Sequence, residues 1–135
     1  MEMINEVEAL ASEFEQCRDV LVALGDANRQ HMILEMMKSK KCEGLRVNEI
    51  TEMTHLSRPA VSHHLQILKR AGILKVRREA TKNYYYFDPD MKTLALLTDT
   101  LQRTIAITEV IAQNHGKEVQ LHTTADATMQ VSKSF

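Results

Sequence analysis

The sequence predicts a mainly α-helical domain of the α+β class, in which four helices, a two-stranded β-hairpin and a fifth helix follow one another. Three observations predict this order. Apolar residues recur every three or four positions over residues 3–24 and 91–114, as they do along one face of a helix. A serine and a glycine bracket a helix-sized segment at residues 57–72. Two β-rich runs, 73–78 and 84–87, flank a polar connection, which is the pattern of a hairpin.

The first three helices follow from periodicity and capping residues. Residues 3–24 are expected to form one continuous helix, because their apolar stripe is unbroken. Asp26 is a candidate N-cap for a second helix over residues 27–39, since its carboxylate can accept from a first-turn N–H. The inner face of this second helix is expected to hold four residues: Met32, Ile33, Met36 and Met37. A short third helix over residues 47–54 ends at a turn near His55.

The fourth helix is expected to begin after the N-cap Ser57 and to end at Gly72. Successive helical residues are rotated by about 100°, which separates two faces. The core face is expected to hold Val61, Leu65 and Leu68. The outer face is expected to hold five polar residues: Arg58, Ser62, His63, Gln66 and Arg70. His64 lies on the flank of the core face, so we expect a packed, hydrogen-bonded histidine; contact with a DNA base is the alternative.

A short helix, a tight turn and a second helix that ends before a basic hairpin make a winged helix-turn-helix. In this arrangement the second helix enters the major groove of DNA, and the hairpin follows the backbone or enters the minor groove. Arg58 stands at the helix end that usually meets base edges and can pair with guanine, while Gln66 can pair with adenine. The phosphate-binding candidates of the hairpin are Arg77, Arg78 and Lys82.

The distribution of charge favours DNA binding, although the whole chain has a net charge of only −1. Residues 58–86 contain seven basic residues and one acidic residue, whereas residues 1–57 and 87–135 are both net acidic. Phosphate binding requires a local basic surface and not a basic protein. A solvated charged face is the simpler reading of such a cluster, but here the cluster coincides with the outer face of the fourth helix and the hairpin.

Several segments resemble the ArsR/SmtB family of bacterial repressors. Residues 23–29, ALGDANR, are similar to the start of that family's second helix. Residues 56–65, LSRPAVSHHL, closely resemble its recognition segment, and residues 68–74, LKRAGIL, also match. The resemblance covers about residues 20–112. It implies a winged helix-turn-helix repressor that binds double-stranded operator DNA as a homodimer, reads an inverted repeat and is released by an effector.

The resemblance also implies that the first and last helices form the dimer interface, which agrees with the narrow apolar stripe of residues 3–24. The expected interface residues are Met3, Val7, Leu10, Phe14, Cys17, Leu97, Leu101 and Ile105. We expect residues 1–115 to form one DNA-binding and dimerisation domain, and residues 116–135 to form a mobile tail.

The metal-sensing patterns of the family are absent, so no metal or other cofactor is expected. Where the resemblance places two sensor cysteines, this chain has Arg46 and Asn48, which are poor ligands for soft metals. No histidine lies between His64 and His115 to complete a site on the last helix. A site that recruits His115 or His122 stays open, and the effector itself is not identified by the sequence.

The sequence leaves alternatives to repression by DNA binding. A thiol-based redox sensor would use Cys42, which lies near several lysines, and Cys17, although an inert buried thiol is the simpler role of Cys17. The methionine-rich second helix could line a pocket for an organic effector, and core packing is its simpler role. A winged-helix protein-interaction module without operator binding is a further alternative.

An enzyme is not expected, because no phosphate loop, nucleophile elbow or HExxH motif occurs. No apolar run approaches the roughly 20 residues of a membrane span. The acidic N-terminus is unlike a secretory signal, so we expect a cytoplasmic protein.

Overall fold

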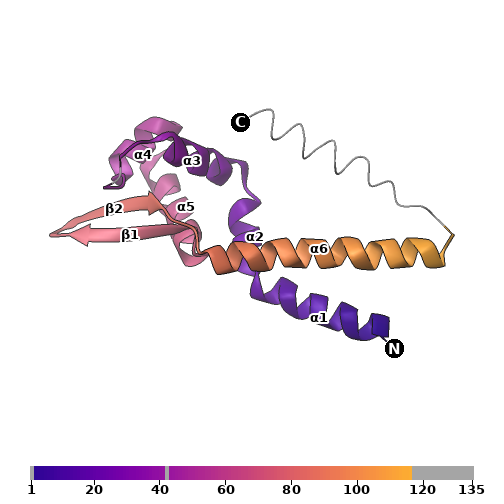
Figure 1. Cartoon of the computed structure of the whole chain (residues 1–135). Helices are drawn as coiled ribbons and strands as arrows, with labels where there is room; N and C mark the ends of the chain where they lie inside the picture. Colours follow the sequence, from indigo (N-terminus) through magenta and orange to yellow (C-terminus); the bar gives the residue numbers. More distant parts are fainter. Residues whose placement is uncertain (1, 42, 117–135) are drawn as a thin grey trace.

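The computed structural model describes residues 2–41 and 43–116 (Figure 1). Six helices and one antiparallel hairpin occur within these residues: α1 (Glu2–Gln16), α2 (Arg18–Leu24), α3 (Ala27–Lys38), α4 (Val47–Thr54), α5 (Arg58–Arg70), β1 (Leu74–Glu79), β2 (Lys82–Phe87) and α6 (Met91–Asn114). The predicted class, mainly α with one hairpin, is confirmed. Among these residues no helix is both long and apolar enough to cross a membrane.

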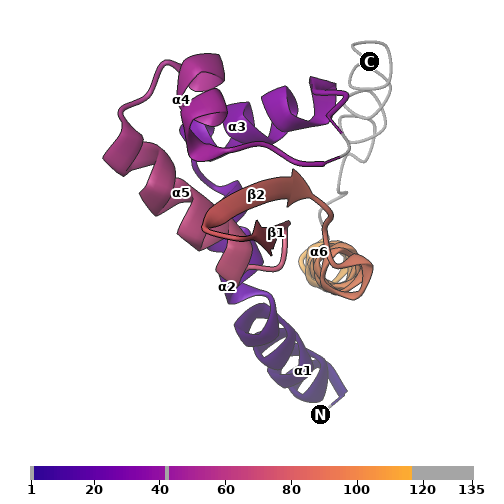
Figure 2. The same ribbon diagram turned by 90° about the vertical axis from the view of Figure 1, so that its left-hand side faces the viewer.

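The molecule has two regions, joined by α2 and α6 (Figure 1). In one region α3, α4 and α5 surround the base of the hairpin, whose tip extends away from the helices. In the other region α1 lies beside the long helix α6. The view along α6 shows the hairpin between α5 and α6, with α1 on the side of the molecule opposite α3 and α4 (Figure 2).

One hydrophobic core joins α2, α3, α4, α5 and the base of β1. Its largest side chains with less than 2% exposure include one or more from each of these elements: Val20, Met32, Ile50, Val61, Leu65, Leu68 and Leu74. Burying a side chain of this size contributes about 1.5–3 kcal/mol. The core therefore fixes the orientation of α5 relative to the helices and the hairpin around it.

Local capping interactions set the helix boundaries that the sequence predicted. The Asp26 carboxylate accepts from the Arg29 backbone N–H at 3.0 Å and starts α3. The Ser57 hydroxyl accepts from the Ala60 backbone N–H at 3.3 Å and starts α5. Gly72, with φ +78°, follows the C-terminal end of α5. These predicted starts and stops are confirmed.

The prediction of one continuous helix over residues 3–24 is wrong, because the helix is interrupted at Cys17. Its apolar stripe serves two different neighbours. The α1 part lies against α6 and has no buried residue, whereas Val20 and Ala23 of α2 are buried against the helix-turn-helix core. A single period in the sequence therefore spans two helices, and the fold has six helices where five were expected.

Two further expectations are corrected. Met37 is 51% exposed, so it does not belong to the inner face of α3 with Met32, Ile33 and Met36. The hairpin connection is also shorter than the predicted polar segment, since Glu79 pairs with Lys82 and only Ala80 and Thr81 lie between the strands. Polar residues extend the ladder here because the tip of the hairpin is exposed, so its side chains need not be apolar.

The hairpin is also joined to the connection between α3 and α4. Leu45 and Tyr85 exchange two backbone hydrogen bonds, of 2.7 and 2.8 Å. The adjacent Gly44 has φ +95°, and a Cβ atom there would lie 2.9 Å from the Tyr85 carbonyl oxygen. A glycine permits both the left-handed backbone and this close approach.

Candidate nucleic-acid interface

The two faces of α5 differ as the sequence predicted. Val61, Leu65 and Leu68 are each 0% exposed and lie in the core. Five polar side chains lie on the opposite, exposed face: Arg58, Ser62, His63, Gln66 and Arg70. This face offers the hydrogen-bond donors of Arg and His and the amide of Gln, which both donates and accepts. These groups can read base edges in a major groove.

His64 is packed, as expected, although its neighbour His63 is exposed. Its Nδ1 atom lies 3.1 Å from Nη1 of Arg29, which is also buried. Arg29 donates two more hydrogen bonds to the end of α2, from Nε to the Ala23 carbonyl at 2.8 Å and from Nη2 to the Val22 carbonyl at 2.9 Å. Because arginine only donates, His64 Nδ1 must accept, so His64 is neutral in this arrangement. Burial lowers the pKa of His64, which is consistent with the neutral form.

The N-terminal end of α5 is joined to α4 through Arg58. Its guanidinium donates a hydrogen bond to the side-chain oxygen of Asn48, near the start of α4. The side chain of Arg58 stays exposed while this bond is made. Arg58 is therefore held at the exposed end of the helix, and four of its five N–H donors remain for other partners.

The three predicted phosphate-binding residues of the hairpin have different surroundings. Arg77 donates to the Glu79 carboxylate at 2.6 Å and to the Glu43 carbonyl at 3.1 Å, and it lies 4.6 Å above the ring of Tyr84. Arg78 makes one hydrogen bond, to the Ala80 carbonyl at 3.2 Å, and Lys82 is exposed near the tip. Arg78 and Lys82 are thus freer to meet a phosphate than Arg77.

A small cavity of about 150 Å³ lies between the starts of α4 and α5 and the tip of the hairpin. Arg58 lines it together with four polar residues that were not among the predicted DNA-binding residues: Arg46, Asn48, Thr81 and Asn83. In the sequence, Arg46 and Asn48 stand out only as positions that lack metal ligands. Their position before and within the first turn of α4 was a usable signal, because helix starts often meet phosphates. The proximity of Thr81 and Asn83 depends on tertiary structure.

Comparison with known proteins identifies the family. Residues 29–76 match the sequence model described as "Bacterial regulatory protein, arsR family". An HTH-type transcriptional regulator of Methanocaldococcus jannaschii is 37% identical over 90 residues, which cover 66% of this chain and 98% of that protein. This chain belongs to the ArsR family. It is a transcriptional regulator with a DNA-binding winged helix-turn-helix domain, and the family is not one of enzymes.

Other relatives match shorter parts of this ArsR-family chain. The HTH-type transcriptional repressor SmtB of Mycobacterium tuberculosis is 33% identical over 67 residues, or 50% of this chain and 47% of that protein. The chain thus spans about half the length of that repressor.

Two solved structures have the same fold. An ArsR family transcriptional regulator gives a TM-score of 0.57 at 15% identity, over 70% of this chain and 92% of that one. A homodimeric winged helix-turn-helix DNA-binding domain from Mycobacterium bovis gives a TM-score of 0.50 at 24% identity, over 76% of this chain and 88% of that one. The winged helix-turn-helix fold class predicted from the sequence is confirmed.

The predicted dimer residues of this ArsR-family chain lie on α1 and α6, apart from Cys17, which lies between α1 and α2. Val7, Phe14, Leu101 and Ile105 are 39–49% exposed, and Met3, Leu10 and Leu97 are half-buried. Cys17 differs, because it is 1% exposed and its sulfur lies 3.9 Å from the Thr100 hydroxyl of α6. Its side chain belongs to the core of the single chain and has no surface to offer a second copy, so its assignment to the interface is corrected.

The structure describes only some of the residues on which the cysteine and metal hypotheses depend. Cys42 and His122 lie outside the described residues, and His115 follows the last turn of α6. Within residues 2–41 and 43–116, no three His, Cys, Asp or Glu side chains are grouped as a metal site would require. The expectation that no cofactor is needed stays a prediction.

Proposed function

We propose that the protein is a cytoplasmic, homodimeric repressor that binds an inverted-repeat operator through α5 and the hairpin, and that an effector releases it. One observation carries this proposal. The exposed face of α5 presents Arg58, Ser62, His63, Gln66 and Arg70, while the opposite face is fixed in the core. A rigid helix that carries base-reading groups at its exposed N-terminal end is what major-groove recognition needs.

Charge supports the same surface. The block of residues 58–86 has a net charge of +6, and it includes α5, β1 and all of β2 except Phe87. Helix α5 supplies base contacts in this proposal, whereas Arg78 and Lys82 supply phosphate contacts. Arg46, Asn48 and Asn83 extend the phosphate-binding surface between α4 and the hairpin tip.

The homodimer is supported by the apolar side chains on α1 and α6. A 15-residue helix with no buried residue in the single chain gains its stability from further packing, because an isolated helix of that length is marginal in water. The homodimeric state of the related Mycobacterium bovis domain supports the same arrangement. A two-fold dimer presents two α5 helices to half-sites about one helical turn apart.

The test is operator binding by the double variant Arg58→Ala, His63→Ala, measured by fluorescence anisotropy with the operator selected from random DNA. We expect specific binding to be lost, because each base contact is worth about 1–3 kcal/mol and both protomers lose two of them. Sedimentation should show the same oligomeric state as the parent protein.

The matched control removes the same residue types elsewhere, with Arg18→Ala, His31→Ala on exposed positions of α2 and α3. It should bind the operator as the parent protein does. Unchanged affinity of the Arg58, His63 variant would refute this assignment. It would favour the alternative, a winged-helix module that contacts proteins.

We also propose that release does not use a metal, because Arg46 and Asn48 occupy the family's cysteine positions and no histidine lies between His64 and His115 to complete a site on α6. Release should therefore be insensitive to Zn²⁺, Cd²⁺ and As(III), and micromolar release by any of them would contradict the proposal. Cys17 is a poor candidate for thiol oxidation, since it is buried and a buried thiol is inert, and Cys42 lies outside the described residues.

A further inference from the structure

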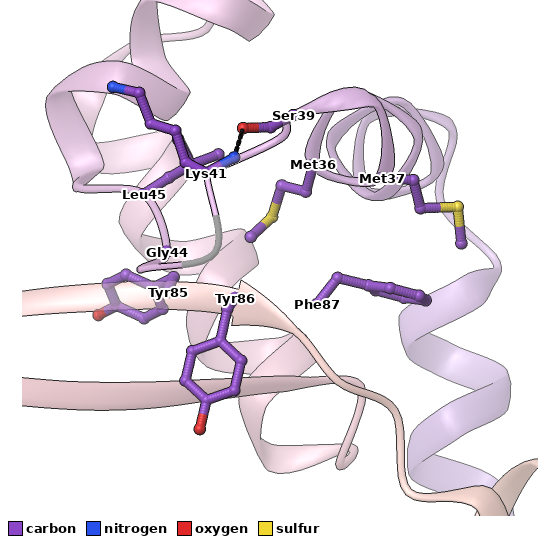
Figure 3. Close-up of a pocket in the computed structure, with 9 residues that line it drawn as sticks. All are labelled: Met36, Met37, Ser39, Lys41, Gly44, Leu45, Tyr85, Tyr86 and Phe87. Carbon is purple, nitrogen blue, oxygen red and sulfur yellow. Dashed lines mark hydrogen bonds between the residues drawn. The ribbon is translucent and has the colours of Figure 1, made fainter.

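A pocket of about 310 Å³ lies between the C-terminal end of α3, the connection to α4 and strand β2 (Figure 3). Its floor is buried, since Met36, Leu45 and Tyr85 are 4–7% exposed. Met37, at its rim, is 51% exposed. In Figure 3 both methionine side chains extend from α3 toward β2, Met37 on the side of Phe87 and Met36 on the side of Leu45 and Gly44. The pocket is thus a concave site with a buried base and exposed thioether and aromatic groups.

The lining of the pocket carries one charged group, and that group already has a partner. Lys41 is the charged residue among those that line the pocket, and its ammonium is hydrogen-bonded to the Glu49 carboxylate on α4. In Figure 3 this ammonium points away from the methionines and Phe87. Ser39 accepts from the Lys41 backbone N–H at 3.4 Å, which leaves its own hydroxyl proton free to donate. The pocket therefore combines neutral hydroxyl groups, on Ser39, Tyr85 and Tyr86, with aromatic and thioether side chains.

The size of the pocket narrows the ligand further. A cavity of about 150 Å³ accommodates benzene, so a volume of about twice that size suits two fused rings. Ligand pockets commonly begin at about 300 Å³. Methionine adapts its shape readily and contacts aromatic rings favourably, which suits flat aromatic guests.

We propose that this pocket binds a small, neutral aromatic molecule of about two rings, and that its binding lowers the affinity for the operator. The second half of this inference rests on the proposed function as a DNA-binding repressor. The first half, binding in the pocket, does not.

The pocket is linked to the hairpin and to α4, whose Asn48 accepts a hydrogen bond from Arg58 of α5. Leu45 joins β2 through its two hydrogen bonds to Tyr85, and only Arg46 separates it from the start of α4. The ion pair of Lys41 with Glu49 is a second link from the connection to α4. A ligand between Met37 and Phe87 would contact α3 and the hairpin together. The ligand would stabilise the spacing of α3 and the hairpin at which it binds more tightly. Operator affinity changes if the DNA complex requires a different spacing of these two elements.

The first experiment measures binding without DNA, using the full chain with ¹³C-methyl methionine and indole as the probe. We expect saturable shifts of the Met36 and Met37 methyl signals, assigned by substitution, with no change at Met3 or Met91. Indole-3-carboxylate, which adds a negative charge, should bind much more weakly. No saturable shift, or equal shifts at all four methionines, would overturn the proposal.

The second experiment measures operator affinity by anisotropy with and without saturating indole. Coupling between sites is typically about 5- to 150-fold, so we expect indole to weaken operator binding by about fivefold or more. Met37→Glu places a charge at the exposed rim, where it should abolish the indole effect and leave indole-free affinity unchanged. Met91→Glu, at a 70% exposed position on α6, is the matched control and should respond as the parent protein does.

The two experiments separate the two hypotheses. An indole effect that persists in Met37→Glu, or operator affinity unaffected by bound indole, would overturn the inference. If the parent protein binds no operator even without indole, the proposed function is wrong, and the methionine shifts still decide whether the pocket binds.

Discussion

Two neighbouring histidines of α5 have different roles because successive side chains on a helix point about 100° apart. His63 is exposed on the outer face, whereas His64 is 9% exposed and lies against Arg29. Through Arg29, His64 connects the recognition helix to the carbonyl groups at the end of α2. His64 therefore positions α5, while His63 remains available to DNA.

This arrangement predicts a dependence of stability on pH. Burial is the largest effect on the pKa of His64 and lowers it below 6.5. The Asp26 carboxylate raises this pKa by a smaller amount, and the charges of Arg29 and His63 lower it further. As pH falls through 6.5, the unfolded chain therefore takes up a proton before the folded chain does. The contribution of His64 to stability is complete above that pH and is lost as the pH falls toward the lower folded pKa.

The measurement is the free energy of unfolding in urea at about pH 7.5 and pH 5.5. His64→Gln keeps an oxygen that can accept from Arg29 and removes the titration, so its stability should fall less between these pH values than that of the parent protein. His31→Gln, at an exposed position of α3, should behave as the parent protein does. An equal fall in the His64 variant would show that other groups cause the pH dependence.

Gly44 carries a second prediction at the residue scale. Gly44→Ala adds a Cβ atom 2.9 Å from the Tyr85 carbonyl oxygen, at a backbone φ of +95°. Strain of this kind costs about 1–3 kcal/mol. We expect that loss in urea unfolding, together with faster amide exchange at Leu45 and Tyr85. Gly116→Ala, with φ +70° and no atom within 4 Å of the added Cβ, is the control for the backbone term alone. Equal losses in the two variants would contradict a clash at Tyr85.

At the scale of the elements, local sequence signals predicted most boundaries. Asp26 and Ser57 mark the starts of α3 and α5 because capping is a short-range interaction. The break at Cys17 was missed, since the apolar period continues through it and the two halves differ in their tertiary neighbours, α6 for α1 and the helix-turn-helix core for α2. The exposed face of α5 was predictable from helical geometry. The cavity between Arg46, Arg58 and Thr81 was not, because those residues meet only through tertiary structure.

The hairpin gives a prediction about the salt dependence of operator binding. Each phosphate contact contributes about 0.9 to the slope of log affinity against log salt, so two copies of one residue contribute about 1.8. Lys82→Gln should reduce the slope by about that amount. Arg77→Gln should reduce it clearly less, because Glu79 already pairs with Arg77. Anisotropy titrations from low to high salt measure both slopes, and a larger reduction for Arg77 than for Lys82 would reverse the assignment of roles.

At the scale of the whole molecule, the apolar residues that are exposed in a single chain indicate where a second copy would pack. Ile4, Val7 and Phe14 on α1 and Leu101, Ile105 and Ile111 on α6 are 39–63% exposed. The sequence placed several of them on one stripe but could not distinguish packing within the chain from packing between chains. The described structure separates these cases, because Thr100 and Ile107 are the residues of α6 that the chain itself buries.

This surface predicts that dimerisation and operator binding are lost together. Leu101→Lys removes one half-exposed leucine from each protomer, which at about 0.8 kcal/mol or more per side chain weakens the dimer by at least about 10-fold. Sedimentation should show a monomer at concentrations where the parent protein is a dimer, and specific operator affinity should fall because one α5 reads only one half-site.

Leu34→Lys, at a 43% exposed leucine of α3 outside this surface, is the matched control and should remain a dimer. A Leu101→Lys protein that stays dimeric would move the interface away from α6. A monomeric variant that keeps full operator affinity would show that one chain is sufficient for recognition. Operator binding that recovers with rising protein concentration is expected, since mass action restores the dimer and with it the second recognition helix.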